Sequence, residues 1–204
     1  MVELTSLWLP ILLSAVAAFV ISAVAWMGMS HHKGDFKPLP DQEGVRSALA
    51  KFNIPRGVYF FPHMKDCKGK SKEEIAAALN RGPVGMLNVY DASMFTSMGR
   101  NMALSFIFYI VTSVVVAYLA SVTLPSGAGF AKVFQVAGTA GVLAYCFACI
   151  PGAIWFGTPL RNVLSSFVDG LVMGLATGAI FAWMWPAALV IEAVSGGNLS
   201  IKPH

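Results

Sequence analysis

Charged side chains are scarce in this sequence. Asp, Glu, Lys and Arg make up 12% of its 204 residues and 56% are hydrophobic, whereas soluble domains carry about 25% charged residues. With a mean hydropathy of +0.67, this composition excludes a soluble globular domain and predicts a protein that crosses the lipid bilayer several times. The net charge of +4 is unevenly placed, so it bears on membrane orientation, and we expect no nucleic-acid partner.

Cysteine is also scarce, with three in the chain. Cys67 is the only one outside an apolar stretch, so the sequence predicts no disulfide framework. Cys146 and Cys149 form a CxxC motif, the spacing that thiol oxidoreductases use. Membrane enzymes of that class use two cysteine pairs, and cysteine also serves as a small apolar residue. We therefore interpret both residues as packing residues, with a membrane thiol oxidoreductase as the least favoured alternative.

Basic residues are missing ahead of the first apolar run. Residues 1–6 contain no Lys or Arg, and the run that follows is longer than the core of a signal peptide. We therefore expect it to stay in the protein as a membrane helix, within a first segment of residues 1–29.

Four apolar runs are long enough to cross a bilayer as helices. They are Leu7–Met29, Met102–Leu124, Phe130–Ile150 and Leu164–Trp185. Pro151-Gly152 is expected to stop the third run and Pro186 the fourth. Residues 101–195 then hold three crossings, with 187–195 continuing as a short interfacial helix, and 196–204 form a polar tail. The predicted fold class is an all-α membrane protein, a four-helix transmembrane bundle.

Residues 30–100 form the one sizeable polar segment, between the first and second crossings. Asp41 can cap a helix over residues 42–52. Ser71 and Glu74 make a capping box for a second helix. The segment is therefore expected to begin its local structure with two short capped helices.

Two stretches of the same segment favour strands. Val58–Phe61 and Val84–Tyr90 are rich in β-branched and aromatic residues and are predicted to pair. About seventy residues can make only a small core. We therefore expect a small α+β polar cap between the first two membrane helices.

Lys and Arg concentrate in this polar segment. Eleven of the fourteen lie within residues 30–100, and Arg161 falls on the same side of the predicted bundle. Lys132 and Lys202 fall on the other side. Cytoplasmic loops of membrane proteins carry an excess of Lys and Arg, so we predict a cytoplasmic residue 30–100 segment and external termini.

Three glycines recur at every fourth residue of the last apolar run. Gly170, Gly174 and Gly178 share one helix face, and small residues at this spacing let another helix backbone approach closely. The plain interpretation is packing within the bundle. The alternative is a docking seam for a partner subunit.

Asp169 is the one acid well inside an apolar run. Acids inside membranes are costly and often functional. Arg161 lies two turns earlier on a similar helix face, and Arg100 and Asn101 are expected at the same level from the second crossing. We interpret these intramembrane polar residues as an ordering salt bridge or hydrogen bond, with a proton or ion relay as the alternative.

His31, His32 and His63 are the candidate metal ligands, and Asp35, Asp66 and Cys67 lie nearby in sequence. Imidazole is a common metal ligand, although the spacing matches no known zinc or iron pattern. Adjacent histidines in an extended segment point to opposite sides. The interpretation we favour is therefore a set of polar residues at the headgroup boundary.

Familiar catalytic motifs are missing. The sequence has no HExxH, no GxSxG and no phosphate-binding glycine loop. No crossing is broken at its centre, which weakens the transporter hypothesis. We therefore assign no catalytic residue and no cofactor.

Four short motifs carry a family resemblance. They are His31-His32-Lys33-Gly34-Asp35-Phe36, Pro38-Leu39-Pro40 with Asp41, Gly82-Pro83-Val84, and Phe167-Val168-Asp169-Gly170-Leu171 leading to Trp183-Met184-Trp185-Pro186. With them the chain resembles a family of uncharacterised bacterial inner-membrane proteins with four helices. The resemblance implies location and fold and lends no activity.

The function that we predict is structural. Small-residue seams suit helix docking, so we expect an accessory or assembly subunit of a larger bacterial membrane complex, whose partners are integral membrane subunits. The alternative is a small homo-oligomeric channel or transporter.

Overall fold

The chain divides into two compact units. In this computed structural model residues 2–193 and 199–203 are described. One unit, here called the membrane unit, comprises Met1–Phe36 and Met102–His204, and the other, the polar unit, comprises Lys37–Asn101. Each unit is described by itself below.

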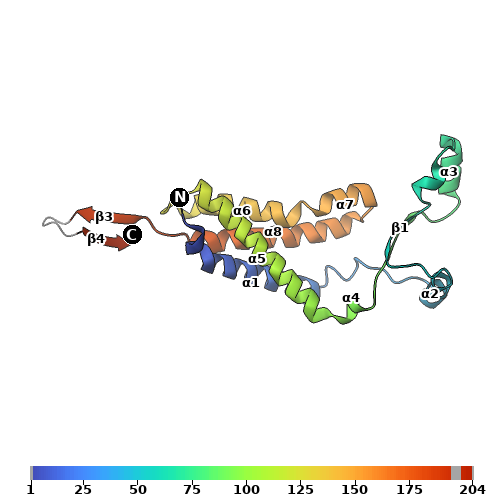
Figure 1. Cartoon of the computed structure of the whole chain (residues 1–204), viewed down its shortest axis with the longest axis horizontal. Coiled ribbons are helices and arrows are strands. Elements are labelled where there is room, and N and C mark those ends of the chain that lie inside the picture. Colours follow the sequence, from blue (N-terminus) through green and yellow to red (C-terminus); the bar gives the residue numbers. More distant parts are fainter. Residues whose placement is uncertain (1, 194–198, 204) are drawn as a thin grey trace. The chain divides into compact units, whose positions relative to one another are not determined.

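Among the described residues, four stretches of helix are long and apolar enough to cross a membrane, which confirms the predicted multi-pass helical fold. They are η1 (Leu4–Leu7), α1 (Trp8–Ala23) and η2 (Val24–Gly28) in series, α5 (Met98–Thr123), α6 (Phe130–Cys146) with α7 (Cys149–Phe156), and α8 (Leu160–Trp183). Figure 1 shows α1, α6 and α8 side by side, with α5 crossing them obliquely.

The third crossing runs further than predicted, so the expectation that Pro151-Gly152 stops it is wrong. The helix bends after Cys146, and α7 then carries the chain to Phe156. Pro151 is the third residue of α7, a position whose N–H has no partner within the helix, so the missing proton costs little. The helix stops instead at Gly157, which takes the left-handed conformation with φ of 67°.

A shared core joins the four crossings. Leu7, Val116, Val133 and Phe181 come from one crossing each, and all are at most 1% exposed. At the same end of the bundle Gly127 N–H donates to the Pro186 carbonyl at 2.8 Å. Lipid tails are as apolar as these side chains, so close packing rather than water exclusion holds such a core together.

The polar unit has the predicted secondary structure. Its two longer helices are α2 (Gln42–Ala50) and α3 (Lys72–Asn80), and its strands are β1 (Gly57–Phe61) and β2 (Gly85–Val89), with short turns of helix at η3 (Met64–Cys67) and α4 (Ser93–Thr96). Asp41 caps α2 by accepting from Gly44 N–H at 2.9 Å, and the Ser71–Glu74 capping box is present. The strands pair antiparallel. Both helix starts and the strand pairing are therefore confirmed.

The chain after α8 departs from the prediction. Residues 189–193 form strand β3 (Leu189–Ala193), which pairs antiparallel with β4 (Leu199–Pro203). The predicted interfacial helix over 187–195 is therefore wrong, and residues 194 and 195 lie outside the described residues. Pro186 cannot continue a helix, and Val190 and Ile191 are β-branched residues that favour a strand.

Candidate metal centre

A tight turn brings His31 and His32 to the same side. After η2, Met29 is extended, and the chain then folds back with Lys33 N–H on the Ser30 carbonyl at 3.1 Å and Asp35 N–H on the His32 carbonyl at 3.0 Å. The two imidazole rings lie 4.2 Å apart between centroids. The expectation that adjacent histidines diverge applies to an extended segment, and here the backbone turns instead.

The Asp169 carboxylate of α8 lies within hydrogen-bonding distance of both imidazole rings. His31 Nε2 lies 2.9 Å from Asp169 Oδ1, and His32 Nε2 lies 2.6 Å from Asp169 Oδ2. The Asp169 side chain is 12% exposed. One carboxylate therefore joins the turn after the first crossing to the fourth crossing, 137 residues further along the chain.

Asp35 and Trp26 complete the surroundings of His32. The Asp35 Oδ2 atom lies 2.6 Å from His32 Nδ1, and the side chains of His32 and Asp35 are 3% and 4% exposed. The Trp26 ring stacks on the His32 ring with centroids 4.0 Å apart and planes within 4°. His32 is thus held at both nitrogens and on one ring face, which leaves it a single orientation.

The first turn of α8 fixes the backbone of the same segment. The Arg161 guanidinium donates to the His31 carbonyl at 3.2 Å, and Asn162 Nδ2 donates to the Asp35 carbonyl at 3.1 Å. A side chain on Gly34 would overlap the Arg161 guanidinium. The Arg161 side chain therefore stabilises the turn by a hydrogen bond to the backbone of the turn.

The charges around His32 favour its protonated form. Burial acts to lower the pKa of the ring, but the hydrogen bonds and charges of Asp35 and Asp169 outweigh burial and raise the pKa of His32 above its usual 6.5. With a proton on each nitrogen, His32 forms an imidazolium between two carboxylates. A metal ion at Nε2 would replace one of those protons.

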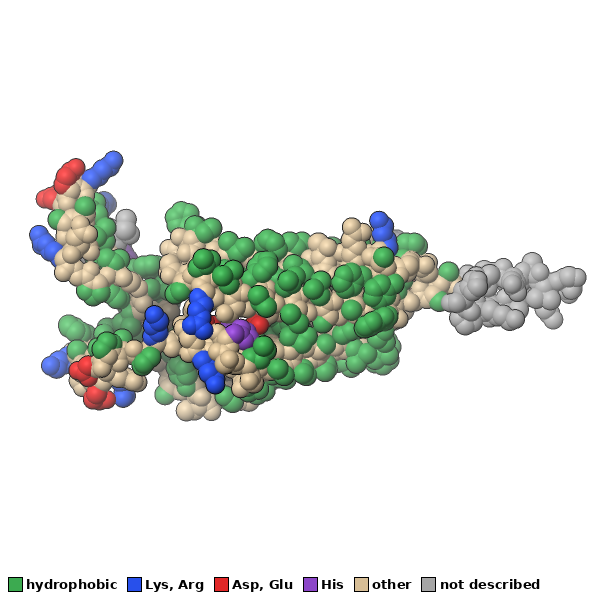
Figure 2. Space-filling model, turned by 180° about the vertical axis from the view of Figure 1, so that it is seen from behind, with side chains coloured by type: hydrophobic (Ala, Val, Ile, Leu, Met, Phe, Trp, Pro, Cys, Tyr) green, Lys and Arg blue, Asp and Glu red, His purple; other side chains and the backbone are tan. Residues whose placement is uncertain are grey.

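These side chains can hold a metal ion. The donor atoms of His31, His32 and Asp169 all lie within 4.8 Å of one another. Two imidazoles and one carboxylate are the protein ligands of many zinc and non-haem iron sites that keep a position open. Asp35, on the far nitrogen of His32, is the outer carboxylate that fixes the orientation of a ligating histidine. Figure 2 shows histidine and acidic side chains together at the surface of the helices, with Lys and Arg side chains next to them and hydrophobic side chains over the rest of that face.

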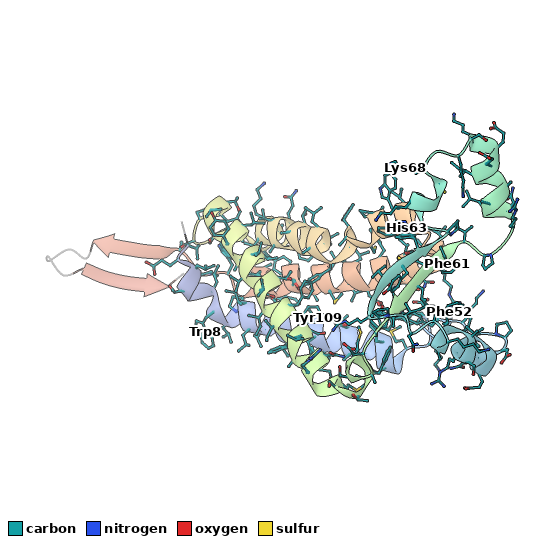
Figure 3. The ribbon with its side chains drawn as sticks, turned by 45° about the vertical axis from the view of Figure 1, so that its right-hand side comes forward. Trp8, Phe52, Phe61, His63, Lys68 and Tyr109 are labelled. Carbon is teal, nitrogen blue, oxygen red and sulfur yellow. The ribbon has the colours of Figure 1, made fainter. Side chains whose placement is uncertain are left out.

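Three other candidate polar residues, His63, Arg100 and Asn101, belong to the polar unit. His63 follows β1 in the polar unit, where its Nδ1 accepts from Lys65 N–H at 3.1 Å (Figure 3). Arg100 and Asn101 stand in the first turn of α5, within the residues assigned to the polar unit. The Asn101 side-chain amide donates to the Met94 carbonyl at 2.8 Å.

The three glycines of α8 lie against α6. A Cβ on Gly170, Gly174 or Gly178 would come within 2.7, 2.5 and 2.6 Å of backbone atoms of α6. On the α6 side two glycines, Gly138 and Gly141, also face α8, and the sequence reasoning did not single them out. Their spacing of three residues places both glycines on one face of a helix, and this pattern in the sequence could have indicated the contact. In the structure this face is occupied within the bundle.

Cys146 and Cys149 are free thiols, and each is hydrogen-bonded to a backbone carbonyl. Cys146 is buried and its Sγ lies 3.4 Å from the Phe167 carbonyl, while the Cys149 thiol donates to the Cys146 carbonyl at 2.9 Å. Neither forms a disulfide in the structure. Their contacts are those of small side chains that fill space at a helix bend.

Comparison with known proteins identifies no relative. No protein-family model, curated protein or solved structure matches the chain. The family resemblance carried by the short motifs therefore stays a prediction.

Proposed function

We propose that this chain is a membrane protein that binds one divalent first-row metal ion, such as Zn²⁺ or Fe²⁺, through His31, His32 and Asp169. The observation that carries the proposal is the convergence of three donors within 4.8 Å. They come from segments far apart in the chain, and His32 is already oriented by an outer carboxylate. Imidazole with carboxylate suits these ions better than Ca²⁺ or Cu⁺.

The number of protein ligands favours a metal site with an open coordination position over a structural metal site. Structural zinc sites are closed by four protein ligands, whereas sites with three keep a position for water or a substrate. Only three donors converge among the described residues. We therefore propose a metal that binds or activates a ligand, rather than one that only braces the fold.

The experiment is a metal analysis of the full chain, purified without a polyhistidine tag in mild detergent. We expect one metal ion per chain, removal by a chelator, and a visible absorption spectrum when Co²⁺ is added back. His31→Ala and His32→Ala should each abolish the spectrum. His63→Ala is the matched control and should leave it unchanged. A wild-type protein that holds no metal and gives no Co²⁺ spectrum would contradict the proposal. It would show that hydrogen bonds between the imidazoles and the carboxylates hold the cluster together without an ion.

A second candidate function is the accessory or assembly subunit. The observation that favours it is in the polar unit, where none of the described residues is buried. Large side chains are among those left exposed, with Phe52 at 74% and Phe95 at 75%. A unit without a core of its own gains stability when another surface covers it. In this proposal the chain lies in a bacterial inner membrane, with residues 30–100 cytoplasmic and the termini external.

Native purification in mild detergent tests the subunit proposal. We expect integral membrane proteins to co-migrate with the chain, and Phe52→Ser with Phe95→Ser to release them while the helices stay folded. A monodisperse single chain would contradict it. In the described part of the chain, no comparable observation favours a channel, a transporter or a thiol oxidoreductase.

A further inference from the structure

A groove in the membrane unit runs up to the histidine–aspartate cluster. It has a volume of about 670 Å³ and lies between the first crossing and α8. Val20, Val24, Val168 and Val172 stand along it, each about half exposed. His31 and Asp169 also line it. The groove is therefore apolar along its walls and polar where the candidate metal ligands meet it.

We propose that this groove binds a single-chain membrane amphiphile with a neutral hydroxyl headgroup. The chain would lie along the valines and the hydroxyl at His31 and Asp169. The inference names a ligand class for the site of the proposed function, but the groove and its polar groups are present with or without a metal ion.

The size of the groove selects a small amphiphile. Its volume lies within the range of about 300–1,000 Å³ that small-molecule sites occupy. At about 30 Å³ for a group the size of a water molecule, it holds roughly twenty such groups. That is room for one chain with a small head, so the second chain of a phospholipid would have to lie outside the groove.

The charges at the polar end select a neutral head. Asp169 presents a carboxylate there, and the Asp35 carboxylate lies directly behind His32. The protonated His32 lies between these two carboxylates, and the Arg161 guanidinium lies on the His31 carbonyl, so the charges of the cluster balance one another. A charged headgroup would therefore find no unpaired charge of opposite sign in the metal-free site, and burying it there would be costly. An uncharged hydroxyl avoids that cost.

A hydroxyl also matches the unused hydrogen-bonding capacity of the cluster. Each Asp169 oxygen has one histidine nitrogen as its partner, and a carboxylate oxygen can accept a second hydrogen bond. His31 has a partner at Nε2, whereas its enclosed Nδ1 has none among the described residues. A hydroxyl both donates and accepts. It can therefore donate to Asp169 in the metal-free protein and offer its oxygen to an ion in the metal-loaded protein.

The test uses three photoactivatable sixteen-carbon probes in lipid nanodiscs that hold the purified full chain. The probes carry an alcohol, a carboxylate or no headgroup, and each has its diazirine at the same chain position. We expect the alcohol probe to label peptides that contain residues 20–31 and 164–172, with competition by unlabelled hexadecanol. The carboxylate and headless probes should label these peptides weakly and without competition.

Two variants assign the labelling to the groove. Val168→Trp fills the groove without altering a ligand of the cluster, so it should abolish the competed labelling and leave the metal content unchanged. Val115→Trp, on an exposed face of α5, is the matched control and should keep the labelling. Equal labelling by all three probes would show that the groove holds ordinary bilayer chains and would overturn the inference. Labelling that persists in Val168→Trp would overturn it too.

The metal-free protein separates the two proposals. Competed alcohol labelling after chelation, or in a wild-type protein that holds no metal, supports the groove even though the metal proposal fails. A metal-loaded protein with no preference for the alcohol keeps the proposed metal centre and overturns the groove.

Discussion

At the scale of single residues, His32 is a buried imidazole between two carboxylates. Its side chain is 3% exposed, and a carboxylate faces each ring nitrogen at 2.6 Å. Taking charges out of water is expensive, and the cost is recovered only where partners satisfy each polar atom. Asp35 and Asp169 supply a partner for each ring nitrogen, and the Trp26 ring stacks on one face of the imidazole. The turn at residues 31–35 therefore depends on this one imidazole.

Replacing His32 by Ala should lower the free energy of unfolding by about 3 kcal/mol, because it leaves Asp35 and Asp169 facing a buried gap without the ring that joins them. The melting temperature of the metal-free protein in detergent measures the effect. His63→Ala, which removes an imidazole from the polar unit, should change stability by much less. Equal losses in both variants would show that His32 contributes no more than an ordinary surface histidine.

The raised pKa of His32 predicts how stability changes with pH. A group whose pKa is higher in the folded protein stabilises it fully below the unfolded value, here near 6.5, and loses that contribution as the pH rises through the folded value. The melting temperature of the metal-free protein should therefore fall as the pH rises above about 6.5 and through the raised pKa of His32. Adding Zn²⁺ at the upper end of this pH range should restore it, since the ion replaces the lost proton.

His32→Asn is the control for this pH dependence, because asparagine does not titrate. Its melting curve should vary less over the same interval. A wild-type melting temperature that rises with pH across the interval would contradict the assignment of the proton to His32.

At the scale of helices, α6 and α8 approach each other most closely. Glycines stand on both sides of the contact, with Gly138 against Gly178 and Gly141 against Gly174. A glycine lacks the Cβ that would hold two backbones apart, and dispersion attraction decays steeply with separation. This contact sets the position of α8, and so of Asp169 relative to the turn that carries His31.

Gly174→Leu should destabilise the bundle by about 1–3 kcal/mol, as overpacking does in other close-packed interiors. Because the seam faces α6, we expect the variant itself to be less stable and to be degraded, rather than to release a partner while folded. Cellular level and melting temperature measure this. The control is Gly99→Leu, where an added side chain meets open space. A stable Gly174→Leu protein would contradict the α6–α8 contact.

At the scale of the whole molecule, the arrangement of polar and apolar segments decides how the chain meets the membrane. Among the described residues four stretches are long and apolar enough to cross a bilayer. If all four cross, we expect the termini on one side of the membrane and residues 30–100 on the other. Most of the Lys and Arg lie in residues 30–100. The prediction of a cytoplasmic polar unit follows from the excess of basic residues in cytoplasmic loops.

Cysteine labelling on intact cells tests this orientation. In a protein with Cys146 and Cys149 replaced by Ala, a membrane-impermeant maleimide should miss Cys67 and should label a cysteine introduced by Ser200→Cys. After permeabilisation both positions should react. Labelling of Cys67 in intact cells would invert the orientation.

Much of the fold could be read from the sequence because its signals are local. Exposing backbone polar groups to lipid is costly, and only a helix or a closed barrel avoids that cost. Four apolar runs long enough to cross a bilayer therefore predict four membrane helices. Asp41 and the Ser71–Glu74 pair mark helix starts with side chains that bond the nearest free N–H groups. The sequence did not predict the strand over residues 189–193, because that strand depends on pairing with β4. A short apolar run alone does not distinguish a strand from a helix.

The candidate site was visible in the sequence only as separate residues. His31, His32 and Asp169 each stood out by type, but the assignment of His63 beside them rested on residue type alone. Whether two imidazoles reach one carboxylate depends on the turn at residues 30–35 and on how closely α8 packs. The sequence by itself determined that polar groups lie at the end of the membrane helices. Only the tertiary structure decided that they meet, because a metal site is set by distances between segments more than a hundred residues apart.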